Sequence, residues 1–595
     1  MAVTLTDIRQ AAPFPGGKGG KGDTLKGAFL VVDEVLVDKK SLDARRANIT
    51  GLAASAQRLW ASCPYDGTIK VFDAVTMQRL AVWPVERAGS LALGADGSLW
   101  VLQEGDASHR PQMIAFDPQG TRLPQHITFD ERTEPAALCA APDGRLLVAD
   151  DGPRQHVLIF DQLASAPRPC ATLGQEGGIY ARRPGEFGTL KFNRPRAIAC
   201  DAQGNVFVAH HGSTGGGSTV LESYTLARQL NWRLQGQTFV DMADADPADD
   251  TQVFTKEERF ELDYRRPRGQ EWAYRGYTVH RFRYPEDPRL HIRSAGAWVR
   301  RIEGRPFLFV NDMNGEHLQI YRWGDDASGE IAIPSGLFAK RHVNQADWPP
   351  HQPERGQWIW RDANGNGAFD AGEFTTHDGT DAPAAQGSWV DAQGGVWLAS
   401  ETRGIRCFPL QGLDAHGNPR WDFASVRSFP HPAGFQQIKR LRYDPSTDCL
   451  YLGGTTAEHK NQHWKPMGPV IARYDGWLKS EGRAEPRWRI VAPYEQGSQG
   501  HSSCEPMGFD VAGEYLFVPY TGASRSLQFK TGHVEVFRAD DGRSVGHFEP
   551  SADVGEIGLQ DVRECLRAHR RSDGEYLIFL EDDYKAKVLL YRWRS

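Results

Sequence analysis

The sequence predicts an all-β protein built as a single large β-propeller. Two short elements recur along the 595 residues and support this prediction. The first is an Asp or Gly turn followed by a short β-rich strand, and the second is an aliphatic strand that ends in an aromatic and a polar residue. Gly (62), Pro (36) and Trp (17) are plentiful, which suits short strands, tight turns and packed aromatic anchors.

The two elements alternate along most of the chain. Copies of the first lie at 96–101, 143–148, 204–209, 394–399, 449–452, 515–518 and 573–578. Copies of the second lie at 69–73, 157–161, 320–323, 471–475, 534–538 and 588–593. Strand, turn and strand at a period of roughly 40 to 65 residues is typical of successive propeller blades, which stack to bury both faces. About nine units can be counted against a usual maximum of about eight blades. We therefore predict eight blades, with seven or nine left open.

The domain organisation follows from where this period is interrupted. Residues 1–26, rich in Gly, Pro and Lys, are predicted to be a flexible tail, and 27–595 to form the propeller. Residues 235–293 are predicted to be an acidic insertion, and residues 335–387 a second insertion. Both would be long excursions from the ring.

Composition argues against several classes of partner and compartment. The net charge is −7 and no basic block stands out, so neither nucleic acid nor a membrane surface is an expected partner. The opening residues have no apolar signal-peptide core, so the chain as written is expected to be cytoplasmic. A periplasmic or secreted location stays open if a signal was removed. The eight cysteines form no CxxC pair, which favours reduced thiols.

The sharpest motif lies in the second insertion, at 362–373, and reads DANGNGAFDAGE. It matches the EF-hand calcium loop, in which several oxygens converge on a hard cation, a Gly makes the turn and a Glu closes the site. The expected ligands are Asp362, Asn364, Asn366, the Ala368 carbonyl, Asp370 and Glu373. The flanking residues do not resemble paired helices, so we expect a structural calcium ion held in a β-hairpin.

The segment 192–201, FNRPRAIACD, continues as GNVFVA at 204–209 and resembles an NHL repeat. Glu134-Pro135, running into Pro142-Asp143-Gly144, is similar to both NHL and gluconolactonase (SMP-30-like) propellers. The resemblance covers most of the chain as a repeat pattern, and it implies the propeller fold.

In SMP-30-like propellers, residues at the start of the innermost strands converge on the axis and hold a catalytic metal. The resemblance therefore implies a second divalent metal at the propeller axis, with Glu134, Asn193, Glu505 and Asp561 as candidate catalytic residues. By the same position in the repeat, several further side chains would lie near the axis. These are Arg194, Arg196, Gln436, Gln437, Lys439 and Arg563. The arginines among them disfavour a bound cation and suit an anionic ligand.

Two functions of different classes follow. The first is a calcium-stabilised propeller that binds a small-molecule or protein ligand through its central funnel face. The alternative is a metal-dependent hydrolase or lactonase of SMP-30-like type acting in that funnel. The sequence leaves open whether the protein is an enzyme, which ligand it takes and how it assembles.

Overall fold

The computed structural model describes residues 29–32, 35–38, 49–64, 66–212, 217–238, 240–345, 348–461, 465–497 and 503–595. The tail predicted at 1–26 lies outside these residues. Strands dominate the described chain, which confirms the all-β, propeller-type fold. No helix within these ranges is long and apolar enough to cross a membrane.

The strands of the described residues form ten antiparallel sheets and one separate hairpin. Eight sheets have four strands, one has six and one has three, and neighbours in each sheet are consecutive in sequence. The first repeated sequence element forms the second strand of its sheet, and the second element forms the third strand. The recurrent turn and strand pattern therefore encodes one blade per repeat.

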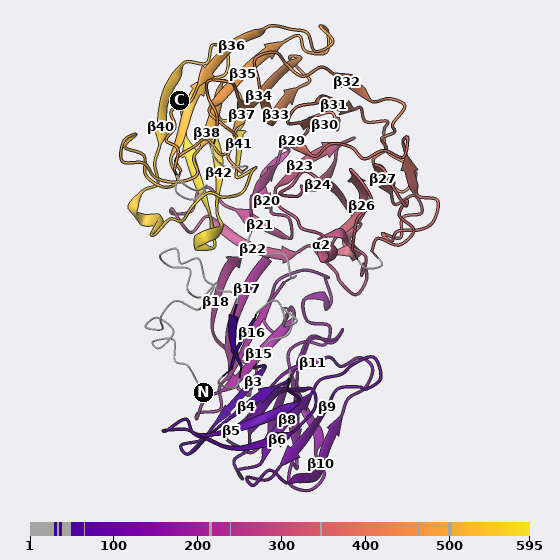
Figure 1. The fold of residues 1–595 in the computed structure, drawn as a ribbon, viewed down its shortest axis with the longest axis vertical. Coiled ribbons are helices and arrows are strands. Elements are labelled where there is room, and N and C mark those ends of the chain that lie inside the picture. Colours follow the sequence, from indigo (N-terminus) through magenta and orange to yellow (C-terminus); the bar gives the residue numbers. More distant parts are fainter. Residues whose placement is uncertain are drawn as a thin grey trace. The chain divides into compact units, whose positions relative to one another are not determined.

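The chain divides into two compact units, each described here by itself. The first holds the described residues up to Ala181 together with Gly188–His211 and Val220–Leu234, and the second holds most of the chain from Gln235 to Ser595. Arg182–Phe187 and the described part of Gly212–Thr219 also belong to the second unit. Figure 1 labels the strands and colours the chain by residue number, so the strands of one sheet have similar colours.

The first unit contains the hairpin β1 (Phe29–Val32) and β2 (Val35–Asp38), and four sheets. The sheets are β3 (Gly51–Ala54), β4 (Arg58–Cys63), β5 (Thr68–Asp73) and β6 (Arg79–Pro84); β7 (Ala88–Leu93), β8 (Leu99–Gln103), β9 (Gln112–Phe116) and β10 (Arg122–Thr128); β11 (Pro135–Ala140), β12 (Leu146–Asp150), β13 (Val157–Asp161) and β14 (Arg168–Leu173); and β15 (Pro195–Cys200), β16 (Val206–His211), β17 (Gly217–Tyr224) and β18 (Leu230–Thr238). A one-turn helix, η3, spans Gly178–Tyr180. Apolar clusters join each sheet to the next.

The second unit contains six sheets. The first three are β19 (Asp244–Asp246), β20 (Asp249–Phe254), β21 (Glu258–Leu262) and β22 (Trp272–Tyr277); β23 (Ala297–Ile302), β24 (Arg305–Asn311), β25 (His317–Trp323), β26 (Ala332–Ala339), β27 (Trp358–Arg361) and β28 (Phe374–Thr376); and β29 (Ala385–Val390), β30 (Val396–Ser400), β31 (Gly404–Phe408) and β32 (Arg427–Phe429). The others are β33 (Gln437–Asp444), β34 (Cys449–Thr455), β35 (Val470–Asp475) and β36 (Pro486–Val491); β37 (Asp510–Ala512), β38 (Tyr515–Pro519), β39 (Val534–Arg538) and β40 (Ser544–Phe548); and β41 (Leu566–Arg570), β42 (Tyr576–Asp582) and β43 (Lys587–Trp593). Short helices lie between them: α2 (Pro288–His291), η4 (Asp326–Ser328), η6 (Ala552–Val554) and η7 (Asp583–Lys585).

The six sheets of the second unit close into a ring. The first strand of each sheet contacts the first strand of the next, and the last sheet packs on the first through Leu577 and Phe579 against Ala245 and Val253. Six polar contacts follow the ring: Val299 N to Asp244 Oδ2 at 2.7 Å, Arg300 Nε to Val390 O at 2.7 Å, Trp389 Nε1 to Tyr443 O at 3.1 Å, Arg442 Nε to Asp510 Oδ1 at 3.1 Å, Ala568 N to Asp510 Oδ2 at 3.0 Å, and His569 Nε2 to Asp244 Oδ1 at 2.7 Å. The second unit is therefore a six-bladed propeller, in which each described sheet packs on a neighbour at either face.

The blade number and grouping differ from the prediction of eight blades in one ring. The structure has ten sheets, four in the first unit and six in the second. The segment predicted as an acidic insertion, 235–293, contributes the sheet β19–β22 to the ring. Its strands carry many charges and lack the Asp/Gly turn copy, which hid them from the repeat count. Asp244 and Asp246 of this segment are buried and bonded to Arg300 and Arg301, so they hold blades together.

The second predicted insertion, 335–387, enlarges one blade. It supplies β27 and β28, which add to the outer edge of the sheet β23–β26 and make it six-stranded. The calcium-loop motif is the connection between these two strands, as the prediction of a β-hairpin requires.

Candidate functional site

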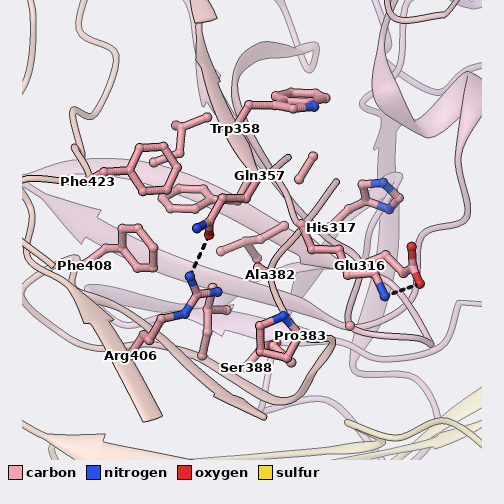
Figure 2. Close-up of a pocket in the computed structure, with 18 residues that line it drawn as sticks. Glu316, His317, Gln357, Trp358, Ala382, Pro383, Ser388, Arg406, Phe408 and Phe423 are labelled. Carbon is pink, nitrogen blue, oxygen red and sulfur yellow. Dashed lines mark hydrogen bonds and ion pairs between the residues drawn. The ribbon is translucent and has the colours of Figure 1, made fainter. Parts of the chain in front are cut away.

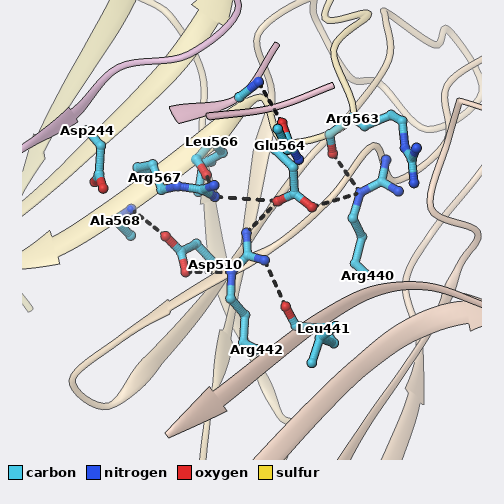
Figure 3. Close-up of polar contacts among 12 residues, drawn as sticks. Asp244, Arg440, Leu441, Arg442, Asp510, Arg563, Glu564, Leu566, Arg567 and Ala568 are labelled. Carbon is cyan, nitrogen blue, oxygen red and sulfur yellow. Dashed lines mark hydrogen bonds and ion pairs between the residues drawn. The ribbon is translucent and has the colours of Figure 1, made fainter. Parts of the chain in front are cut away.

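The centre of the six-bladed ring is filled with charged side chains. Every inner strand except β29 contributes an acidic or basic group to it, directly or from the residues just before the strand. The group comprises the buried residues Arg440, Arg442, Arg563, Arg567, Asp244, Asp510 and Glu564, together with the partly buried Arg300, which pairs with Asp244. Figure 3 shows Glu564 among the guanidinium groups of Arg440, Arg442 and Arg567. Buried charges of this kind are stable only when they are paired and hydrogen-bonded.

Arg442 connects two of the carboxylates. Its Nη2 donates to Glu564 Oε2 at 2.8 Å and its Nε donates to Asp510 Oδ1 at 3.1 Å. Burial raises the pKa of Glu564, but the charges of Arg442, Arg567 and Arg440 outweigh it and hold this pKa below its usual value. Glu564 is therefore ionised in the folded protein.

Trp389 of β29 supplies an aromatic platform to the same centre. The guanidinium carbons of Arg442 and Arg300 lie 4.2 and 4.4 Å from its ring centroid. Arg567 lies 5.1 Å from the centroid of Trp298 on β23. The quadrupole of an indole face attracts cations, so the tryptophans partly offset the cost of burying these arginines.

Further carboxylates act on this centre: Asp391 on Arg300, and Asp312 and Glu401 on Arg563. Burial, followed by the charge of Arg442, lowers the pKa of Arg567. Within the described residues, Nε and Nη2 of Arg567 have no hydrogen-bond partner. The ring therefore buries both basic and acidic groups near its axis.

One end of the axis gathers several residues that the sequence singled out. Lys439 is buried on β33, and burial lowers its pKa to about 8, with the charge of Glu401 acting against that shift. Glu505 is buried and adds a smaller charge effect on Lys439. Lys465 Nζ lies 2.7 Å from Asp561 Oδ2.

Arg563 and Gln437 lie at the start of inner strands of this ring, as predicted. Arg563 donates to the backbone carbonyls of Met313 and Gln386, so its head group joins two other blades. Gln437 Nε2 donates to Glu401 Oε2 at 3.2 Å, and Gln436 is exposed. Gln436, Gln437, Glu505, Asp561 and Arg563 thus all belong to the second unit.

The remaining predicted residues belong to the first unit, so no single ring carries the whole predicted set. Glu134 is exposed and its backbone N–H donates to Asp150 Oδ1 at 2.9 Å. Arg196 Nη1 lies 3.0 Å from Asp151 Oδ2, and Arg194 Nε lies 3.8 Å from the same oxygen. The backbone N–H of the buried Asn193 donates to His210 Nδ1 at 3.3 Å. The backbone N–H groups of Glu134 and Asn193 thus donate to side chains of the first unit.

The sequence reasoning missed the buried carboxylates that organise both units. Asp150 is fully buried, and burial raises its pKa to about 6. Its Oδ1 accepts N–H groups of Glu134 and Gly152, while Oδ2 has no hydrogen-bond partner among the described residues and lies 3.7 Å from His156 Nε2. Asp244, Asp510 and Glu564 were also missed. In the sequence each of these carboxylates is a charged residue within or next to a short aliphatic strand. A search for metal-ligand patterns does not detect such residues.

The calcium-loop motif has the hydrogen-bond pattern of a closed loop. Asp362 Oδ1 accepts the N–H of Gly367 at 3.0 Å, Asn364 Oδ1 that of Asn366 at 3.0 Å, and Asn366 Oδ1 that of Ala368 at 2.8 Å. Gly367 has a φ of 74°, and a Cβ there would lie 2.7 Å from the Tyr284 ring. A glycine is therefore required at the sharp turn of the loop.

Glu373 closes the loop from its last position. Its Oε1 accepts the N–H of Ala363 at 2.8 Å and its Oε2 that of Trp360 Nε1 at 2.9 Å. Asp370 Oδ2 accepts both side-chain amides, from Asn364 and Asn366, at 2.7 Å. Carboxylate, amide and carbonyl oxygens therefore surround one loop, and this donor set fits a hard cation such as Ca²⁺. Arg322 Nη2 lies 3.3 Å from the other oxygen of Asp362, which leaves Oδ1 for an ion.

A pocket opens between the β23–β28 and β29–β32 blades (Figure 2). Its volume is about 420 Å³ including the open mouth. Phe338, Phe408 and Phe423 line it, and Arg406 Nη1 donates to Gln357 Oε1 at 2.6 Å inside it. Lys340 and Glu316 form an ion pair in the same lining, at 2.7 Å between Nζ and Oε1. Four of the polar side chains of this pocket are therefore already paired with one another.

No protein-family profile matches the chain, and no curated protein matches it in sequence. Among solved structures it is similar to hydrazine synthase of Kuenenia stuttgartiensis, with 11% identity over 49% of this chain and 92% of that chain at a TM-score of 0.25. A second is the Cps50 (Swd1) β-propeller domain of Myceliophteria thermophila, with 13% identity over 70% of this chain and 95% of that chain at a TM-score of 0.24. A third is PorZ of Porphyromonas gingivalis, described as an essential surface component of the type-IX secretion system, with 10% identity over 92% of this chain and 75% of that chain at a TM-score of 0.23.

At these TM-scores the likenesses carry no argument about this chain. The resemblance to NHL and SMP-30-like propellers stays a prediction from the sequence. What the chain's own topology establishes is a β-propeller architecture.

Proposed function

We propose that the chain is a ligand-binding propeller protein whose six-bladed unit receives an anionic small molecule at the axial end that contains Lys439, Lys465 and Arg563. The observation that carries this proposal is the group of basic side chains at that end. Lys439 is buried, and burial lowers its pKa to about 8, with the charges of Arg440 and Arg563 adding to that shift. A carboxylate or phosphate group on a ligand would form charge-assisted hydrogen bonds with these cations.

The proposal includes one structural calcium ion in the loop 362–373. The ligands would be Asp362, Asn364, Asn366, the Ala368 carbonyl, Asp370 and Glu373. The ion would hold the β27–β28 hairpin, which the Asn418 side chain and the Glu286 carboxylate already join to neighbouring segments. Two neutral Asn ligands favour moderate affinity.

The alternative, a metal-dependent hydrolase or lactonase, is less well supported. It needs Glu134, Asn193, Glu505 and Asp561 around one ion, but these residues are divided between the two units. Among the described residues, the group of His, Cys, Asp and Glu ligand atoms close enough to share a metal lies in the β39–β40 hairpin, not at the axis. Lys439, Lys465 and Arg563 further disfavour a cation at that end.

Proton uptake tests the binding proposal. An anion next to Lys439 raises the pKa of that amine, so binding at about pH 8.5 takes up a proton. Calorimetric titration with inorganic phosphate and with citrate, in buffers of different ionisation enthalpy, measures this uptake. We expect Lys439→Met, which keeps a similar volume and removes the charge, to weaken binding and abolish the uptake.

Lys479→Met is the matched control, because Lys479 is exposed on a loop of the same unit and should bind as the wild type does. Equal binding by all three proteins would place the anion elsewhere. Absence of any heat with both anions on the wild type would reject an anion-binding axis.

A further inference from the structure

The hairpin of β39 and β40 carries two copies of the same tripeptide pattern. His533-Val534-Glu535 runs into β39, and His547-Phe548-Glu549 ends β40. In a strand, residues two apart point to the same face. Each tripeptide therefore presents one histidine and one glutamate on the same side of its strand.

The register brings the two patterns together. Glu535 pairs with His547 and Val534 with Phe548, so extending the ladder by one residue sets His533 opposite Glu549. Directly opposite residues of an antiparallel pair have neighbouring side chains. Val534 and Phe548 face the apolar cluster on the other side, which fixes the histidines and glutamates to this one.

Three of the four side chains are placed as metal ligands would be. One ligand atom each from His533, His547 and Glu549 lies within 4.8 Å of the others. His533 Nδ1 is 3.5 Å from Glu549 Oε1, and the two imidazole rings are 4.8 Å apart, centroid to centroid, with an angle of 29° between them. Exposed His547 can rotate to shorten the distance to the bonds of about 2.0–2.1 Å that imidazole makes with zinc.

The fourth side chain holds His533 in the required state. Glu535 Oε1 lies 2.9 Å from His533 Nε2, so Nε2 carries the proton and Nδ1 presents its lone pair. The side chain of His533 is fully buried, and Nδ1 makes no hydrogen bond within the described chain. The Phe529 ring stacks on the His533 imidazole, with 3.6 Å between the two ring centroids. A carboxylate on the other nitrogen of a histidine is the usual support of a metal-binding imidazole.

We propose that His533 Nδ1, His547 and Glu549 form a binding site for a zinc-class transition-metal ion, with Glu535 as the positioning residue. Two imidazoles and one carboxylate suit Zn²⁺ far better than Ca²⁺, and solvent at the exposed side supplies the fourth ligand. Lys530 Nζ lies 2.8 Å from Glu549 Oε2, and the Lys530 backbone N–H donates to Oε1 at 3.3 Å. A carboxylate oxygen has two lone pairs, so Oε1 retains one for the metal. This site is independent of the calcium loop and of the axial end.

Zinc titration of the full-length protein tests the site. The protein is stripped with a chelator, refilled with Ca²⁺ and titrated with Zn²⁺ against a chromophoric competitor. We expect one Zn²⁺ per chain, and we expect His547→Ala and Glu549→Gln each to weaken its affinity by about 10- to 100-fold or more. Co²⁺ in place of Zn²⁺ should give the visible absorption of a four-coordinate ion.

His126→Ala is the control, because His126 is also an exposed histidine in an outer strand but lies outside the cluster. It should bind Zn²⁺ as the wild type does. Thermal unfolding without metal should be unchanged in His547→Ala, since that side chain is exposed. If the wild type binds no Zn²⁺, or if His547→Ala and Glu549→Gln bind it as His126→Ala does, these residues form only a ladder of cross-strand His–Glu pairs and the proposal is rejected.

Discussion

At the scale of single residues, buried charge is the feature that most distinguishes this protein. Arg442 is almost fully buried and bonds both Glu564 and Asp510 at the centre of the ring. Transferring such charges from water costs several kcal/mol per ion, and only good geometry offsets that cost. Removing one partner leaves the others charged and unpaired.

We therefore expect Arg442→Met to lower the free energy of unfolding by about 3–5 kcal/mol. Urea denaturation followed by tryptophan fluorescence measures it. Arg543→Met, which removes an exposed arginine paired with Asp541, should change that free energy by no more than about 1 kcal/mol. Similar losses in the two variants would show that the axial network does not stabilise the ring.

For Asp150 we expect that removal of the charge stabilises the protein, because burial raises its pKa to about 6 from its ordinary value of 3.8. The folded protein holds this proton between those two pH values and the unfolded chain does not. The contribution of Asp150 to stability is therefore full below about pH 4 and is lost as pH rises through about 6.

Asp150→Asn removes that loss and keeps the Oδ1 acceptor for Glu134 and Gly152. At pH 7 we expect the variant to unfold at a higher temperature than the wild type, with a free energy of unfolding that is larger by up to about 3 kcal/mol. At pH 3.5 we expect both proteins to unfold at the same temperature. Calorimetry at both pH values measures this difference. A variant less stable at pH 7 would mean that the ionised carboxylate is stabilised by a partner.

At the scale of elements, the β27–β28 hairpin carries the loop for which we propose a calcium ion. Its two strands share one short ladder, and the twelve residues between them are held by side-chain oxygens that accept loop N–H groups. A cation bound to the folded loop stabilises the fold by mass action.

We expect Ca²⁺ at a hundredfold excess over its dissociation constant to stabilise the protein by about 2.7 kcal/mol, and chelation to reverse this. Differential scanning calorimetry with and without Ca²⁺ measures the effect. Glu373→Gln should abolish the response, whereas Glu354→Gln, at an exposed site in the same insertion, should retain it. A response in Glu373→Gln equal to that of the wild type would place calcium elsewhere.

At the scale of the whole molecule, ring closure brings the last blade of the second unit against the first. Leu577 and Phe579 of the last blade pack on Ala245 and Val253 of the first, and His569 contacts Asp244. The residues that close the ring therefore lie at the two ends of 235–595, and a blade with both faces packed needs both neighbours.

We expect the fragment 235–595 to fold by itself and to unfold in one cooperative transition, followed by circular dichroism. The shorter fragment 235–564, which lacks β41–β43, keeps five blades and leaves the first and fifth unpacked. We expect it to be aggregated or without a sharp transition. Equal cooperativity in both fragments would show that ring closure contributes little.

Much of the fold and part of the site could be predicted from the sequence. The Asp/Gly turns and aromatic-ended strands indicated blades because each repeat fixes its own hairpins locally. The calcium-loop motif at 362–373 was found in a β-hairpin as expected, because its spacing is contained within twelve neighbouring residues. The β19–β22 sheet was missed because its charged strands gain their stability from Arg300, Arg301 and His569, which are distant in sequence.

The amino-acid pattern thus predicts an all-β chain of repeated blades with one loop whose residues suit calcium. Three features became visible only in the folded chain: how the blades are divided between two units, which charged residues meet at the ring centre, and that His533, His547 and Glu549 share one face of a hairpin. The difference lies in the range of the interactions. Turn and strand preferences act between near neighbours, whereas the pairing of buried charges depends on which distant strands pack together, and that is settled only when the ring closes.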